Sequence, residues 1–559
     1  MGSARVATRK FYFIETVSGV LRKRETQTSG SMENLDYLSA ALAAILTYAI
    51  YTAIWRLYFS PIAHFPGPRL AALTHGYEAY YNNVKGGKYI YRIQEMHNRY
   101  GPIVRISPSD LHVNDPNFYD VLYPSTTSGR RANKSASLTK FFGLDDSLFS
   151  TIEHDTHRMR RAALLPFFSP SYVRRLQPMF QERLDVLLAR MAALKDTEQA
   201  VNASCLFAAF SNDLVQTLAF GQCAGKLETP DFDSSERDAA LSGAQSFHVL
   251  KRIPWLNNVM MAMPEAVSHV LSPSLASFMR QKRMTREQIA RLSCVSADEF
   301  AGADVTPIFQ QVMLSSKLPP SEKSVERVAQ DAQMLLMAGT LTMASVLEHL
   351  IYWMVDNPAV LQRLKTELCE VMPSIDDVGK VPIAKLEGLP YMTAIVKESI
   401  RLIYGNSTPH FRFDPDKSLV YDDAATGRRW EIPRNTSVGM SSVLLHHNEQ
   451  HFPESSRFVP ERWIGDDGKK LDKYNVGFGK GSRVCIGMPQ AYAVMRLVLA
   501  QVWRLWASPG AQIGDEIGVL SLHDTSPHDV QMSGDFFVAA YNKIQGVEFK
   551  LHDMKVRTI

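Results

Sequence analysis

Phe478-Gly-Lys-Gly-Ser-Arg-Val-Cys-Ile-Gly487 sets one cysteine, Cys485, in a short stretch with glycines at positions 479, 481 and 487. Glycine lets a backbone approach a flat ligand closely, and Arg483 places a cation two residues before the thiol. The segment from Met488 onward predicts a helix whose N-terminal dipole favours a negative sulfur. A lone cysteine is more often an inert buried residue. This loop instead favours a thiolate that donates to iron, with Phe478 covering a porphyrin edge.

The loop fits the pattern Phe-x-x-Gly-x-Arg-x-Cys-x-Gly, whose defined positions at fixed spacing rarely coincide by chance. At these residues the sequence resembles the cytochrome P450 family. The resemblance implies that Cys485 is the axial ligand of the iron in haem b. It also implies a cofactor-binding loop made by Phe478, Gly481, Arg483 and Gly487.

Glu398 and Arg401 form a Glu-x-x-Arg pair on one face of a predicted helix, which by itself is usually a surface salt bridge. About sixty residues later stands Phe458-Val-Pro-Glu-Arg-Trp463. In the family, the arginine of that segment, here Arg462, closes a buried network with the first two residues. The planar fork of arginine suits this role because it binds a carboxylate bidentately. The resemblance implies a structural network that locks the region around the cysteine loop.

Three further residues match positions that bind the haem propionates in the family. His157 and Arg161 are four residues apart, so both turn toward one helix face. Arg412 follows the Glu-x-x-Arg helix within Pro409-His-Phe-Arg-Phe413. Taken singly, each residue is better explained as part of a solvated basic face. Their order along one chain favours the cofactor role.

The residues from Ser324 to Asp356 predict a long helix that is stopped by Asn357 and Pro358. At 1.5 Å per residue it would span roughly 50 Å and cross the whole domain. A second membrane span is the rival interpretation, but Glu348 and His349 interrupt the apolar residues.

Midway along this helix, Ala338-Gly339-Thr340-Leu341-Thr342 resembles the oxygen-activating segment of the family. The resemblance implies that Ala338 and Gly339 leave room for dioxygen and that the Thr342 hydroxyl relays protons. Leu341 departs from the family pattern, which has an acidic residue here that helps to feed protons from solvent. Three outcomes stay open: slower turnover, delivery through water or a substrate hydroxyl, or chemistry that does not need two protons.

Residues 37–58 include an uncharged run long enough for a transmembrane anchor, with Trp55 and Tyr58 near its end. Residues 1–36 form an N-terminal extension whose basic block would export the large domain, so we hypothesise that Met32 is the native start. A proline-rich elbow, residues 59–68, would orient the domain over the membrane. Residues 69–559 then predict one catalytic domain, mainly α with small β-sheets. The resemblance implies that this domain has the cytochrome P450 fold, with one N-terminal transmembrane helix before it.

Composition narrows the class further. Of 559 residues, 45% are hydrophobic and 21% charged, which is the balance of a packed globular enzyme. The net charge of +4 is scattered rather than gathered in one stripe, so no nucleic-acid partner is expected. Five cysteines without regular spacing favour a reducing compartment over a disulfide framework or a zinc module. We expect the sequons at Asn133, Asn202, Asn406 and Asn435 to be unused.

The resemblance implies a haem-thiolate monooxygenase that hydroxylates or epoxidises a small apolar natural product, a terpenoid or polyketide. It would use dioxygen and electrons from NADPH through NADPH–cytochrome P450 reductase, with cytochrome b5 as a further partner. The implied location is the endoplasmic reticulum membrane, single-pass, with the catalytic domain in the cytosol. The segments around Cys485 and His523 look most like fungal microsomal enzymes of secondary metabolism, including the trichodiene-oxygenase-like group. A haem-thiolate isomerase or dehydratase without external electrons, and a non-catalytic haem-binding protein, are the alternatives.

Overall fold

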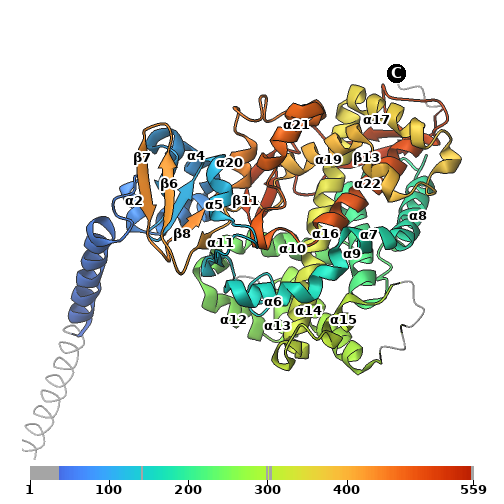
Figure 1. Cartoon of the computed structure of the whole chain (residues 1–559). Helices are drawn as coiled ribbons and strands as arrows, with labels where there is room; N and C mark the ends of the chain where they lie inside the picture. Colours follow the sequence, from blue (N-terminus) through green and yellow to red (C-terminus); the bar gives the residue numbers. More distant parts are fainter. Residues whose placement is uncertain (1–36, 140–142, 297–299, 301–304, 555–559) are drawn as a thin grey trace, which may run out of the picture.

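The computed structural model describes residues 37–139, 143–296, 300 and 305–554. One long apolar helix, Tyr37–Phe59, projects away from the body of the molecule (Figure 1). Its most apolar window has a mean hydropathy of 1.7 and is 0% buried, so protein covers none of it. It includes the predicted anchor, residues 37–58. The predicted extension 1–36, with its proposed start at Met32, lies outside the described residues.

The end of this helix is held against the domain by hydrogen bonds from Arg105 to main-chain carbonyls. Buried Arg105 donates one hydrogen bond to the Arg56 carbonyl, at 2.8 Å, and another to the Pro108 carbonyl, also at 2.8 Å. Its own N–H donates to the Pro66 carbonyl, at 2.7 Å. Gly67 passes so close to Arg105 that a Cβ there would lie 2.4 Å from its carbonyl oxygen. The proline-rich elbow is therefore fixed against the domain.

Helices make up most of the body. The longer ones are α4 (Tyr89–Tyr100), α6 (His154–Leu164), α8 (Gln177–Ala193), α9 (Ala203–Phe220), α10 (Ser235–Gln245), α14 (Pro273–Cys294), α16 (Val325–Asp356), α17 (Pro358–Val371), α19 (Pro390–Ile403) and α22 (Met488–Leu505). Shorter ones that the argument uses are α12 (Pro254–Ala262) and α13 (Glu265–Leu271).

The strands form small sheets. The largest has the order β1-β2-β8-β5-β3, from Ile103–Arg105, Asp110–Val113, Ser437–Gly439, Arg412–Phe413 and Asn133–Lys134. A second has the order β4-β13-β10-β9, from Val201–Asn202, Glu548–His552, Gly518–Leu522 and Trp506–Ala507. Two hairpins pair β11 (Met532–Phe536) with β12 (Val538–Tyr541) and β6 (Leu419–Asp423) with β7 (Arg428–Ile432). The prediction of a mainly α fold with small sheets is confirmed.

Helix α16 is the central element of the body (Figure 1). The Ser324 side chain caps it by accepting from the Arg327 N–H, and Pro358 begins α17 directly after it. Both α16 and Tyr37–Phe59 are apolar and long enough to cross a bilayer, but half of the apolar window of α16 is buried. It packs along α9 and against α14. The predicted long helix is confirmed as a core helix, and the rival membrane span is not supported.

Candidate active site

A cavity of about 360 Å³ lies between α16 and the segment that carries Cys485. One end is walled by Ala338 and Thr342 of α16, and the other by Cys485 and Phe478. Much of the rest of its lining is apolar and comes from several elements, including Leu164, Phe168, Phe309, Leu335, Val346 and Phe537. The structure therefore brings the two stretches singled out in the sequence to opposite walls of one apolar cavity.

The Cys485 thiol faces this cavity and is accessible from it, although it lies deep inside the protein. Burial raises its pKa, whereas the N–H groups of Gly487 and Met488 and the cation of Arg161 lower it. Those N–H groups belong to the first turn of α22, as the dipole argument predicts. The Cys485 N–H donates to the Phe478 carbonyl at 2.9 Å and closes the loop. The loop thus directs one sulfur and several favourable dipoles into the cavity.

Six basic side chains line the same cavity: Lys134, His157, Arg161, His410, Arg412 and Arg483. None of them forms a salt bridge within the described residues. Burial and the neighbouring Arg412 lower the pKa of Arg483 to about 9. Burial and nearby arginines lower the pKa of His157 to about 2, so its imidazole is neutral. The cluster has an uncompensated positive charge that a ligand with two carboxylates would neutralise.

The residues present fit a haem. The cavity offers a sulfur donor for a metal, apolar walls for a flat ring, and cations for two acidic groups. The guanidinium of Arg161 makes no hydrogen bond within the described residues and is free for an anionic ligand. Arg412 uses one nitrogen on the Phe411 carbonyl, at 2.9 Å. Such a site defines the class of proteins that hold a metalloporphyrin through a cysteine sulfur.

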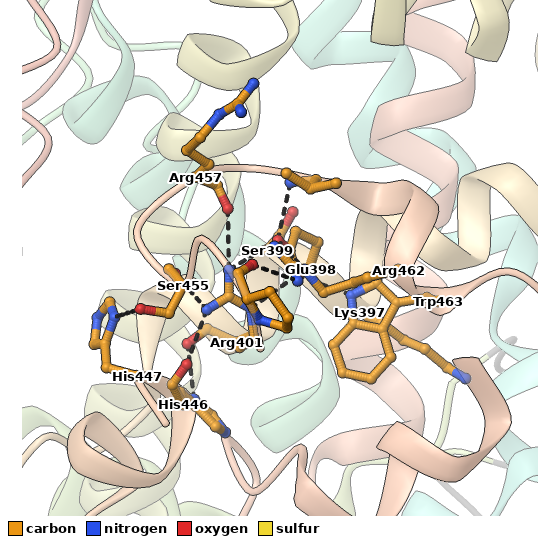
Figure 2. A network of polar contacts seen from close by, with 12 residues as sticks. Lys397, Glu398, Ser399, Arg401, His446, His447, Ser455, Arg457, Arg462 and Trp463 are labelled. Atoms are coloured by element: carbon orange, nitrogen blue, oxygen red, sulfur yellow. Dashed lines mark hydrogen bonds and ion pairs between the residues drawn. The ribbon is translucent and has the colours of Figure 1, made fainter. Parts of the chain in front are cut away.

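Figure 2 shows the polar network around Glu398. Arg401 binds Glu398 bidentately, with both N–O distances 2.8 Å, and neither side chain is exposed. Arg462 adds a single contact of 3.1 Å through Nε. The structure therefore brings together all three residues predicted for the network. It adds Trp463, whose indole N–H donates to Glu398 at 2.8 Å.

His446 connects this network to the cysteine loop, and the sequence reasoning missed it. The Val476 N–H donates to His446 Nε2 at 2.9 Å, so Nε2 accepts and Nδ1 carries the proton toward the Arg401 carbonyl, 2.7 Å away. Burial and the Arg401 charge lower the pKa of His446 to about 3, which agrees with a neutral ring. Val476 begins the turn of the loop, because its carbonyl accepts from the Gly479 N–H. The network therefore holds the start of the loop.

The structure adds packing roles for two residues of the loop, whose cofactor-binding roles stay predictions. Arg483 lines the cavity and donates to the Thr151 and Ile152 carbonyls, each at 2.7 Å, just before α6. Its side chain therefore fastens the loop to the segment before that helix, and Arg161 is the cation that lowers the pKa of the thiol. Gly481, with φ +73°, allows close contact with the chain, since a Cβ there would lie 2.4 Å from the Tyr123 carbonyl oxygen.

The segment of α16 predicted to activate oxygen, residues 338–342, divides between two faces. Ala338 and Thr342 line the cavity. The Thr342 hydroxyl donates to the Ala338 carbonyl at 2.6 Å, the bond one turn back that such a threonine can make. A Cβ at Gly339 would lie 2.6 Å from Val215 of α9, and the role of Gly339 toward dioxygen stays a prediction. Its lack of a side chain serves the close packing of α16 on α9.

Comparison with known proteins agrees with this geometry. Residues 78–506 match the cytochrome P450 family. The chain is 38% identical over 503 residues to the cytochrome P450 monooxygenase tpcC of Cochliobolus heterostrophus, covering 90% of this chain and 94% of that protein. It is 36% identical to the tryptophan 6-hydroxylase fscE of Fusarium equiseti, covering 91% and 96%. It is also 36% identical to the N-acetyltryptophan 6-hydroxylase ivoC of Emericella nidulans, covering 89% and 94%.

The chain belongs to the cytochrome P450 family. It is an oxidoreductase of the monooxygenase class, and its family implies haem as the cofactor.

Proposed function

We propose that the Cys485 sulfur would bind the iron of haem b, and that His157, Arg161 and Arg412 would hold the propionates. The observation that carries this is a thiol accessible from an apolar cavity beside cations without acidic partners. In this proposal Phe478 lies against the ring edge, Gly487 gives the sulfur its N–H dipole, and Arg483 and Gly481 fix the loop. Glu398, Arg401 and Arg462 keep that loop in place from behind.

When bound, the haem supplies dioxygen activation, with electron donation from the cysteine sulfur. The chain's own residues do the rest. The apolar walls exclude water and orient a substrate between α16 and the ring site. The Thr342 hydroxyl is held by the Ala338 carbonyl, so its oxygen faces the cavity and can accept a hydrogen bond from water and pass on a proton.

The substrate we propose is a small, largely apolar natural product of terpenoid or polyketide type, hydroxylated or epoxidised in fungal secondary metabolism. The mainly apolar lining supports this proposal, because it offers little to recognise a strongly polar molecule. An aromatic amino acid derivative is the second candidate, favoured by the two relatives named as tryptophan-type hydroxylases.

Isotope labelling tests the reaction. Microsomes holding this chain and an NADPH–cytochrome P450 reductase are given a sesquiterpene hydrocarbon, an aromatic polyketide, tryptophan or N-acetyltryptophan under oxygen-18 dioxygen. We expect an NADPH-dependent product that carries one labelled oxygen atom, from one member of this panel. A product that forms without NADPH and without label would instead support an isomerase or dehydratase. Oxidation of tryptophan or its acetyl derivative alone would replace the first substrate proposal with the second.

We also propose that Tyr37–Phe59 anchors the chain in the endoplasmic reticulum with the domain in the cytosol, beside the reductase and cytochrome b5. Removing residues 1–59 should move the protein from the membrane pellet to the soluble fraction while the ferrous–CO spectrum persists. Asn435 is an exposed asparagine within a sequon. It would be glycosylated only if the domain faced the lumen, so its glycosylation reports the orientation of the domain. Full-length protein whose gel mobility changes with endoglycosidase would contradict the cytosolic orientation.

A further inference from the structure

A second cavity, of about 90 Å³, adjoins the proposed haem site at Thr342. Thr342 lines both cavities. The second cavity opens between α10, α16 and the β11–β12 hairpin, and its lining includes the exposed residues Gln245 and Ile544. It can hold water molecules. It therefore extends from the surface of the protein to the threonine of the oxygen-activating segment.

Polar side chains of α16 follow this cavity one turn apart. Thr342, Ser345 and Glu348 are spaced three residues from one another, and His349 is four from Ser345, so they share one helix face. All four line the cavity. The Ser345 hydroxyl lies beside Tyr541 of β12, where it opposes the rise in the tyrosine pKa that burial causes. This face of α16 thus carries a row of side chains that can donate or accept protons.

Glu348 is a buried carboxyl group that forms no ion pair with an arginine or lysine among the described residues; the Ser204 hydroxyl and the Val547 N–H are the hydrogen-bonding groups that act on it. The residue is 6% exposed, and its Oε2 atom has no hydrogen-bond partner among the described residues. Gly546 makes room for it, since a Cβ there would lie 2.6 Å from Oε2. The nearby Arg237 uses its nitrogens on Ser204, Asp238 and main-chain carbonyls, and none of its hydrogen bonds goes to Glu348. Burying a carboxyl group with one oxygen unpartnered costs free energy, and no ion pair offsets that cost here.

Monooxygenation needs two protons per turnover: RH + O₂ + 2 e⁻ + 2 H⁺ gives ROH + H₂O, with the electrons from NADPH. Position 341 holds leucine, which cannot supply protons to this site. We propose that Glu348 conducts protons from solvent, through Ser345 and water in the second cavity, to Thr342. This inference rests on the proposed oxygen activation beside Thr342, and it makes Glu348 a positioning residue for protons rather than a catalytic one.

The charges around Glu348 suit proton exchange near neutral pH. Burial raises the pKa of Glu348 to about 7, against opposing effects of Arg237, the Val547 N–H and the Ser204 hydroxyl. His349, on the same helix, is neutral because burial lowers its pKa to about 4. The other titratable groups that face this region are Tyr541 and Cys205, whose pKa values burial raises, and Lys543 and Asp529, which line the cavity.

The sign of the pH dependence follows from this pKa. A carboxyl group with a raised pKa keeps its proton below about pH 7 and loses it as the pH rises. The proton-donating form therefore declines through neutrality, and the NADPH-driven rate should fall on the alkaline side. Glutamine at position 348 does not titrate, so the fall in rate on the alkaline side should be absent from the Glu348→Gln variant.

The test compares Glu348→Gln, Glu348→Asp and Ser345→Ala in the full-length haem-loaded enzyme with reductase. Glu326→Gln, at the exposed start of the same helix, is the matched control. Infrared difference spectra of the holoprotein between pH 5.5 and 8.5 give a readout that does not depend on activity. We expect a carboxyl band that titrates near pH 7 in the wild type and is missing only from Glu348→Gln.

Turnover with the best compound of the labelling panel gives the second readout. Glu348→Gln should lower the NADPH-driven kcat at least about 100-fold, the low end of proton-transfer contributions, without a change in KM. It should also raise the solvent deuterium isotope effect, and Glu348→Asp should restore part of the rate. Turnover driven by hydrogen peroxide, which brings its own two protons, should be affected much less.

Three results would overturn the inference. One is a wild-type rate, isotope effect and pH profile in both Glu348→Gln and Ser345→Ala. Another is a higher KM with unchanged kcat, which would assign Glu348 to substrate binding. The third is the absence of a titrating carboxyl band in the wild type. If the wild type itself shows no thiolate spectrum and no labelled product, the proposed function fails, and the infrared titration still decides whether Glu348 exchanges a proton.

Discussion

Cys485→Ala should abolish both the thiolate ferrous–CO spectrum and NADPH-driven oxygenation. The side chain is the sulfur donor that lines the proposed haem cavity, and among the described residues no other cysteine lines it. Changes of residues behind a metal ligand typically cost about 10–100-fold in affinity or activity, so loss of the ligand itself should cost more than about 100-fold. Haem content per chain, the CO spectrum and the rate of labelled product formation measure this effect.

Cys369→Ala is the matched control, because this partly buried thiol lies on α17, away from the cavity. It should leave the spectrum and the activity close to the wild type. Cys485→His offers a nitrogen donor at the same position, so it should restore some haem binding with a spectrum that is no longer of the thiolate kind. A thiolate spectrum and full activity in Cys485→Ala would place the iron ligand elsewhere and refute the site.

The parts of the fold that local patterns determine could be predicted. Ser324 and Pro358 mark the ends of α16 because a cap and a helix breaker act on their immediate neighbours. The largest sheet could not be predicted in the same way. Its neighbours β2 and β8 pair Asp110 with Ser437, more than three hundred residues apart in the chain. Such a register depends on packing of the whole domain, and two-residue strands carry no periodic signal of their own.

The candidate site shows the same division. Cys485 and Arg161 could be predicted to lie at one site because each belongs to a motif of fixed residue types and spacing, and the structure places both at the same cavity. Roles that depend on the direction in which a residue points could not be predicted in this way. The Cβ direction of Gly339 points toward α9, because a one-residue step along a helix turns the side chain by about 100°. His446 was missed because one histidine has no signal until Val476 and Arg401 are placed on either side of it. Glu348 appeared in the sequence only as an interruption of an apolar helix.

Glu398→Gln should be the most destabilising single change outside the ligand, because it removes the negative charge of a fully buried network. Glu398 binds Arg401 bidentately and also accepts from Arg462, Trp463 and the Val459 N–H. Removing one partner of a buried ion pair leaves an uncompensated charge, which typically costs about 3–5 kcal/mol. That is a large part of the roughly 5–15 kcal/mol by which a folded domain is stable.

The effect should reach the haem, because Arg401 is linked through His446 to Val476 and so to the cysteine loop. We expect a lower thermal unfolding midpoint and a several-fold lower haem content per chain, measured on the same preparation. Glu454→Gln is a close control: Glu454 and Arg457 repeat the Glu-x-x-Arg spacing as an ion pair, but both side chains are more than half exposed. An exposed pair is largely hydrated and contributes little, so this variant should match the wild type. Equal effects of the two substitutions would show that burial is not what gives the Glu398 network its role, and the proposed link from that network to the cysteine loop would fail with it.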